Sequence, residues 1–110
     1  MSSLDLIQGT LHVLVLRALA GEPRHGYQIA RWVRERTAGD LRIEEGALYP
    51  ALHRLRRRGW VASEWGTSEN NRRAKFYRLT PRGRRQLDRE VERWRRYASA
   101  MGAALAEEEV

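Results

Sequence analysis

The chain has 110 residues, of which 42% are hydrophobic and 32% are charged, and its formal net charge is +7. This length corresponds to one domain with at most a short appended element, so it leaves no room for a separate catalytic domain. The absence of cysteine excludes disulfides, thiolate zinc sites, iron–sulfur clusters and cysteine nucleophiles.

The N-terminal region carries no sign of export or membrane insertion. The first five residues lack the basic segment of a signal peptide. The apolar run Leu11–Ala20 is interrupted by Arg17 and is too short to span a bilayer. We therefore expect a soluble, cytoplasmic protein without a membrane partner.

Apolar residues at helical spacing predict three short helices in the first half of the chain. The first has Thr10 as its N-cap and ends before Gly21. The second runs from about His25 to Thr37, and the third from about Glu44 to Arg58. Pro50 conflicts with a helix interior, so either the third helix starts late or its first turn is distorted.

The second half of the chain predicts a β-hairpin and one long helix. Two runs rich in aromatic and β-branched residues, Trp60–Trp65 and Lys75–Leu79, predict strands joined by a polar loop. We expect Trp60 and Trp65 to pack against the third helix. Thr80-Pro81 combines an N-cap hydroxyl with proline at the first helical position, and the helix it opens runs to about Leu105.

This order of elements is that of a winged helix-turn-helix domain followed by a C-terminal helix. In such a domain the third helix enters the major groove and the hairpin loop reaches the flanking DNA. The sequence thus predicts a mainly α fold with a small β-hairpin, of the α+β class. We expect a DNA-binding domain over residues 1–79, and a dimerisation helix with an acidic tail over residues 80–110.

The excess positive charge lies in one central block. Residues 46–85 contain eleven basic and two acidic residues, whereas the rest of the chain contains ten basic and twelve acidic residues. A local basic block on a folded domain indicates a polyanionic partner, most often nucleic acid. A solvated surface in a chain with twenty arginines and one lysine would also be basic, so composition alone leaves both interpretations open.

Basic and polar residues fall on the elements that a winged helix brings to double-stranded DNA. Arginine can pair two donors with guanine, whereas tyrosine, histidine and backbone amides mostly contact phosphates. Some of these residues have structural alternatives: Tyr49 packing on the second helix, Tyr27 in the core, and Gly46 as a helix-start glycine. The candidate DNA-binding residues are His25, Tyr27, Gly46, Tyr49, Pro50, His53, Arg54, Arg57, Arg72, Arg73 and Lys75.

The long C-terminal helix carries apolar residues at intervals of 4, 3, 4, 3 and 4 positions. This spacing is a heptad seam, which is typical of paired helices and predicts a homodimer. The predicted interface residues are Leu87, Val91, Trp94, Ala98, Met101 and Leu105.

Three segments resemble the PadR-like transcriptional regulators, in sequence, order and spacing. They are His25-Gly26-Tyr27-Gln28-Ile29, Gly46-Ala47-Leu48-Tyr49-Pro50-Ala51-Leu52-His53-Arg54-Leu55, and Phe76-Tyr77-Arg78-Leu79-Thr80-Pro81-Arg82-Gly83. The resemblance covers roughly residues 4–101, and with a single helix after the hairpin the chain is similar to the short subfamily. It implies a DNA-binding regulator that acts as a homodimeric winged-helix repressor. It also implies that Trp94 can line a pocket between subunits for a flat, apolar small-molecule effector.

Other function classes have less support in the sequence. The three histidines have no second histidine at the i, i+3 or i, i+4 spacing of a metal site, and no acid pair, nucleophile motif or glycine-rich phosphate loop is present. We therefore expect no enzyme activity, no metal and no cofactor. The serious alternative is a non-specific or architectural nucleic-acid-binding protein, which would share the basic block but would not need a paired dimer.

Overall fold

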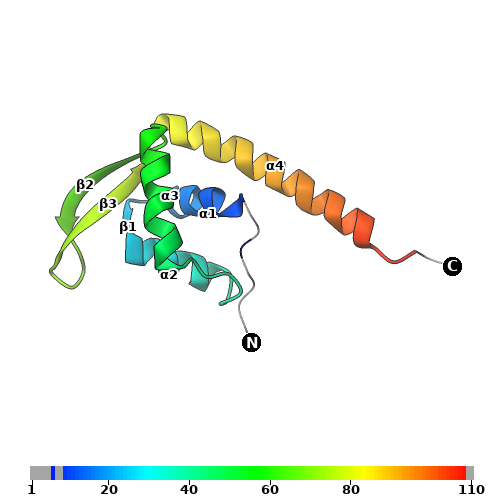
Figure 1. The fold of residues 1–110 in the computed structure, drawn as a ribbon, viewed down its shortest axis with the longest axis horizontal. Helices are drawn as coiled ribbons and strands as arrows, with labels where there is room; N and C mark the ends of the chain where they lie inside the picture. Colours follow the sequence, from blue (N-terminus) through cyan, green and yellow to red (C-terminus); the bar gives the residue numbers. More distant parts are fainter. Residues whose placement is uncertain (1–5, 7–8, 109–110) are drawn as a thin grey trace.

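The structure is a computed structural model that describes residue 6 and residues 9–108. It contains four helices and a three-stranded antiparallel sheet, which confirms the α+β winged-helix fold (Figure 1). The elements are α1 (Thr10–Ala18), β1 (Arg24–His25), α2 (Gly26–Arg36), α3 (Glu45–Arg57), β2 (Val61–Thr67), β3 (Arg73–Leu79) and α4 (Pro81–Leu105). Among the helices described, none combines the length and apolarity needed to cross a membrane.

The sheet has the strand order β1-β3-β2. The hairpin of β2 and β3 was predicted, although both strands extend further toward the loop than expected. β1 was not predicted, because two residues carry no alternation pattern. It pairs His25 with Phe76 and Arg24 with Tyr77, so it joins the N-terminus of α2 to the base of the hairpin.

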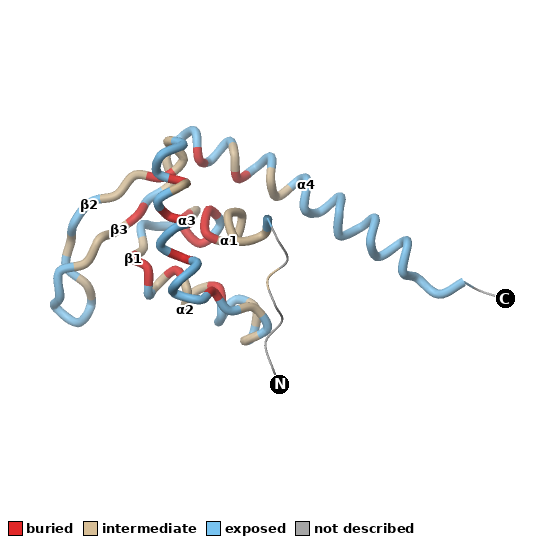
Figure 2. Tube along the Cα trace, viewed as in Figure 1, coloured by how far each residue is buried: buried red, intermediate tan, exposed pale blue. Residues whose placement is uncertain are grey.

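The core lies where the first three helices meet the base of the hairpin and the start of α4. Figure 2 shows the buried segments concentrated there, whereas the distal half of α4 is exposed throughout. The largest fully buried side chains are Leu16, Ile29, Leu48, Leu52, Leu55, Val15, Val33 and Val61. All of these residues except Val61, which lies on β2, are on the inner faces of α1, α2 and α3. Helical spacing predicted the inner faces of α2 and α3, whereas on α1 the buried Leu16 was not predicted.

Two helix starts differ from the sequence-based expectation. Thr10 is the first helical residue of α1 rather than its cap; the cap is Gly9, whose φ of 90° lies in the left-handed region that glycine tolerates. α3 does not start late, since it runs without a break from Glu45 and Pro50 lies within it. The missing N–H of Pro50 deprives the Gly46 carbonyl of its usual helical donor, and both residues are exposed to water.

The start of α4 is fixed against the base of the hairpin. The Thr80 hydroxyl donates to the Gly59 carbonyl at 2.6 Å and accepts the Gly83 N–H at 3.0 Å, which confirms Thr80 as the cap. A Cβ at Gly83 would collide with the Trp60 carbonyl oxygen, so only glycine allows this approach of helix and strand. These contacts set the direction in which α4 leaves the domain.

Candidate nucleic-acid interface

The outer face of α3 lies opposite the core and carries no large apolar side chain. Leu48, Leu52 and Leu55 are buried on the inner face. A helix turns by about 100° per residue, so four other positions of α3 lie on the side opposite these leucines. These four exposed residues are Gly46, Pro50, His53 and Arg57. A Cβ at Gly46 would meet no atom within 4 Å, so packing inside the protein does not require this glycine.

Arg54 lies on the flank of α3 that faces α1, not at the centre of the outer face. Its Nε donates to Nε2 of His12 at 3.3 Å, and the side chain is partly buried. Burial, and next the charge of Arg54, lower the pKa of His12. The neutral imidazole therefore serves as the acceptor for the guanidinium. Of the candidate DNA-binding residues on α3, Arg54 thus lies beside α1 rather than on the outer face.

The opposite flank of α3 meets the N-terminus of α2. A Cβ at Gly26 would lie 2.5 Å from the Tyr49 hydroxyl, so the Tyr49 ring packs on α2, as one of the two interpretations of the sequence held. The ring is nevertheless 42% exposed. Tyr27 is 62% exposed and lies under the guanidinium of Arg31, at 5.6 Å from its ring centroid, so it is not a core residue.

His25 is not positioned to contact DNA through its side chain. The residue is only 9% exposed, and its Nδ1 accepts the Gln28 N–H at 3.4 Å to cap α2. The Gln28 side chain in turn accepts the His25 N–H at 3.1 Å, which completes a capping box. The spacing of His25 and Gln28 across a helix start was the available signal for this structural role.

The hairpin carries the other basic candidates to an exposed position. Arg72 and Arg73 are exposed, and the Arg73 guanidinium lies 4.3 Å from the Trp65 ring centroid. The Lys75 ammonium lies 5.7 Å from the same ring. The prediction that Trp65 packs on α3 is wrong, because the indole is 58% exposed between these cations. Cation–π contacts of this kind hold flexible basic side chains in place on the hairpin.

Sequence reasoning missed a link between α3 and the hairpin. The Arg56 guanidinium donates to the Ser63 hydroxyl at 3.4 Å, so this arginine bridges α3 and β2. Trp60, by contrast, is partly buried against the core as predicted and has the Arg58 guanidinium 5.1 Å from its ring centroid.

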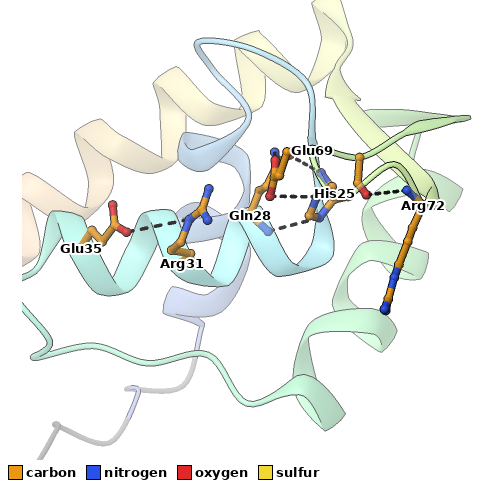
Figure 3. A network of polar contacts seen from close by, with 7 residues as sticks. His25, Gln28, Arg31, Glu35, Glu69 and Arg72 are labelled. Carbon is orange, nitrogen blue, oxygen red and sulfur yellow. Dashed lines mark hydrogen bonds and ion pairs between the residues drawn. The ribbon is translucent and has the colours of Figure 1, made fainter.

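The hairpin loop is itself tied to α2. The Glu69 carboxylate accepts a hydrogen bond from the Gln28 amide at 2.8 Å (Figure 3). Within the loop, the Ser68 N–H donates to the Arg72 carbonyl at 2.8 Å, and Asn71 adopts a positive φ of 59°. Loop and α2 therefore form one connected surface beside α3.

The predicted heptad seam divides into two parts. Leu87 is buried in the core and Val91 packs against that core, so the exposed part of the predicted seam begins at Trp94. Beyond it, Ala98, Met101 and Leu105 are exposed. Tyr97 was missed; its ring stacks on Trp94 with centroids 5.9 Å apart and is 55% exposed. A groove of about 420 Å³ between α1 and α4 is lined in part by these two rings.

Proteins of known structure share this arrangement. A transcriptional regulator from Clostridium thermocellum is 28% identical, with a TM-score of 0.82 over 94% of this chain and 100% of that chain. A PadR family transcription regulator from Clostridium difficile is 30% identical, with a TM-score of 0.77 over 89% of this chain and 100% of that chain. Uncharacterized protein X of Lysinibacillus sphaericus is 30% identical over 90 residues, or 82% of this chain and 83% of that protein.

The family assignment follows from the sequence as well as from the fold. The sequence model of the transcriptional regulator PadR-like family matches residues 15–89, which include α2, α3, the hairpin and the start of α4. The function of this family is DNA-binding regulation of transcription, and its members are not enzymes. The chain belongs to the PadR-like family of transcriptional regulators.

Proposed function

We propose that two copies of this chain form a homodimer that binds a specific, pseudo-palindromic site in double-stranded DNA. Each α3 enters a major groove with Gly46, Pro50, His53 and Arg57, and each hairpin contacts the flanking backbone with Arg72, Arg73 and Lys75. The observation that carries this proposal is the position of the polar outer face of α3 beside a basic hairpin, in a chain that also exposes an apolar helix face.

The distal half of α4 supports the homodimer. All residues from 92 to 105 are exposed in the single chain, so packing against the other described residues contributes little to the stability of these turns. Most helical stability in proteins comes from packing an apolar face, and contiguous exposed apolar residues mark interaction sites. A second copy of the same helix, packed along Trp94, Met101 and Leu105, buries both seams at once. In our division of the chain, residues 1–79 bind DNA and residues 80–110 dimerise; residues 109–110 of the acidic tail lie outside the described part.

The geometry of such a dimer makes a prediction about the DNA. Two α3 helices in successive major grooves require half-sites about one helical turn, roughly 10 bp, or a multiple of it apart. If each subunit neutralises three or four phosphates, affinity should fall by about three to five orders of magnitude between 50 and 200 mM salt.

We further propose that the dimer acts as a repressor, as its resemblance to the family suggests. A flat, apolar effector that stacks on Trp94 at the subunit interface would change the angle between subunits and so the spacing of the α3 helices. The support for this part is the exposed Trp94–Tyr97 pair beside the α1–α4 groove.

The test is binding of the purified protein to the DNA upstream of its own gene and to scrambled DNA of equal length, at physiological salt. We expect a preference of at least about a thousandfold, with protection of a two-fold symmetric site. If the protein shows no preference for the upstream DNA, selection from genomic fragments extends the search to operators elsewhere. Equal binding to every fragment would overturn specific regulation and favour the architectural alternative. Joint replacement of Arg72 and Arg73 with Ala should flatten the salt dependence and leave the sequence preference intact.

A further inference from the structure

The loop between β2 and β3 contains an acid, Glu69, close to several basic residues. Its residues 68–72 are Ser-Glu-Asn-Asn-Arg, and Arg73 and Lys75 follow on β3. A carboxylate close to DNA phosphates weakens binding by charge repulsion, and like charges in contact are costly. Binding to DNA explains the basic residues around Glu69, but it does not explain the presence of this carboxylate.

Both carboxylate oxygens of Glu69 lie near polar side chains at the start of α2, although the Glu69 side chain remains 46% exposed (Figure 3). Oε2 accepts a hydrogen bond from the Gln28 Nε2 at 2.8 Å. Oε1 lies 4.0 Å from the Nε2 of His25. The contact joins two residues 41 positions apart in the chain, so it fixes tertiary rather than local structure.

The partners of Glu69 are themselves held in place. Because the Nδ1 of His25 accepts the Gln28 N–H, the neutral ring carries its proton on Nε2, which faces Glu69. This Nε2 is buried and has no hydrogen-bond acceptor among the described residues. The edge-to-face contact of the ring with Phe76, at 5.3 Å between centroids, fixes its plane. The capping box orients the Gln28 amide in the same way, with its oxygen on the His25 N–H and its nitrogen toward Glu69.

We propose that Glu69 is a positioning residue that latches the hairpin loop to the N-terminus of α2. The latch presets the angle between the hairpin and α3 before DNA arrives, and it keeps the carboxylate turned away from the phosphates. A surface contact between two flexible side chains adds little, but here one partner is already immobile, so less entropy is lost when the contact forms. The inference rests on the proposed DNA binding, because positioning the hairpin matters only if the hairpin contacts DNA.

The test compares Glu69→Ala with the matched variant Glu64→Ala. Glu64 is exposed on β2 of the same hairpin, so both variants remove one carboxylate from a DNA-binding surface. Electrostatics alone makes both variants bind operator DNA more tightly, by about twofold to threefold at low salt. The latch predicts that only Glu69→Ala binds more weakly, by about threefold to tenfold. Glu69→Gln, which keeps an acceptor for the Gln28 amide, should recover part of the loss. Equal tightening by Glu69→Ala and Glu64→Ala would overturn the latch.

A second measurement needs no DNA and separates the latch from the proposed function. The N–H groups of Asn71 and Arg72 are hydrogen-bonded within the loop, to the Ser68 carbonyl at 2.9 Å and the Ser68 hydroxyl at 3.3 Å. We expect their hydrogen exchange in the free protein to be about threefold or more faster in Glu69→Ala than in Glu64→Ala. Unchanged exchange would overturn the latch while leaving DNA binding untouched. If exchange is faster in Glu69→Ala but the protein binds no specific DNA site, the result would support the latch and count against specific regulation.

Discussion

α3 and α4 are both amphipathic, but they differ in whether their apolar side chains are buried within the chain. α3 buries its apolar residues Leu48, Leu52 and Leu55 within its own subunit and presents a polar face outward. α4 does the same only through Leu87 and Val91, and from Trp94 onward its apolar side chains are exposed. The polar face fits a hydrated polyanion, and the apolar face fits a second apolar surface. An amphipathic pattern therefore identifies a face that needs covering without saying which chain covers it.

The largest effect should come from a charge on the exposed seam of α4. Met101→Asp should convert the dimer to a monomer, because pairing the helices would bury an unpaired carboxylate. Operator affinity should then fall by about a hundredfold or more, since the two half-sites no longer bind as one unit. Sedimentation equilibrium and DNA titration measure the two effects. Arg96→Asp, on the opposite side of α4, is the control for oligomeric state, and a dimer that survives Met101→Asp would refute the seam.

Replacing Arg54 and replacing Arg57, which lie about one turn apart on α3, should have different effects on operator affinity. Arg57→Ala removes a side chain from the outer face and should weaken operator binding by about tenfold to a hundredfold. Arg54→Ala should change operator affinity little, because its guanidinium is engaged by His12. A competition assay against DNA variants measures both. Equal losses for the two variants would show that the inward position of Arg54 is not kept on DNA.

The joint at the start of α4 should be sensitive to a single methyl group. Gly83→Ala should lower the free energy of unfolding by about 1–3 kcal/mol, because the new Cβ collides with the Trp60 carbonyl. Gly46→Ala, where a Cβ meets open space, should raise it by up to about 1 kcal/mol through helix propensity. Urea denaturation gives both values. If both variants changed the free energy of unfolding by the same amount, the contact between Gly83 and Trp60 would have to relax to admit the new methyl group.

The smallest predicted effect concerns pH and the inner flank of α3. The pKa of His12 is lowered from 6.5 in the folded chain, by burial first and by Arg54 next. The unfolded chain thus takes up the proton at higher pH than the folded chain, so the stability that neutral His12 supplies is present above pH 6.5 and is lost as pH falls below it. His12→Gln, which keeps an acceptor for Arg54, should lessen the fall in Tm between pH 7.5 and 5.5. An identical pH dependence in the variant would exclude His12 as its source.

Much of the fold was predictable because its signals are local. Thr80-Pro81 marked the start of α4, and helical spacing identified the inner faces of α2 and α3. Neither β1 nor the exposed position of Trp65 had such a signal. Strand alternation puts Trp65 on the same face of β2 as the buried Val61, but the hairpin extends beyond the core before it reaches Trp65.

The sequence predicted which helices and strands contribute to the candidate site, but not which of their side chains face outward. Residue type identified His25 and Arg54 as polar candidates, but tertiary neighbours decide whether a polar side chain faces out. His25 caps its own helix through a local contact with Gln28, whereas Arg54 binds His12, a contact that depends on how α3 meets α1. Glu69 was overlooked because an acid in a basic loop suggests nothing until its partner on α2 is known.

The close contact of Gly83 with Trp60 has a consequence for how such regulators diversify. In the proposed dimer, the contact of Gly83 with Trp60 would hold α4 at a set angle to its own domain, so the crossing angle of the two α4 helices would determine the separation of the two α3 helices. Substitutions along the distal seam can then change which operator spacing is read while the base-reading residues stay the same. In the proposed dimer, half-site sequence and half-site spacing would therefore depend on different parts of one short chain, and each could evolve without the other.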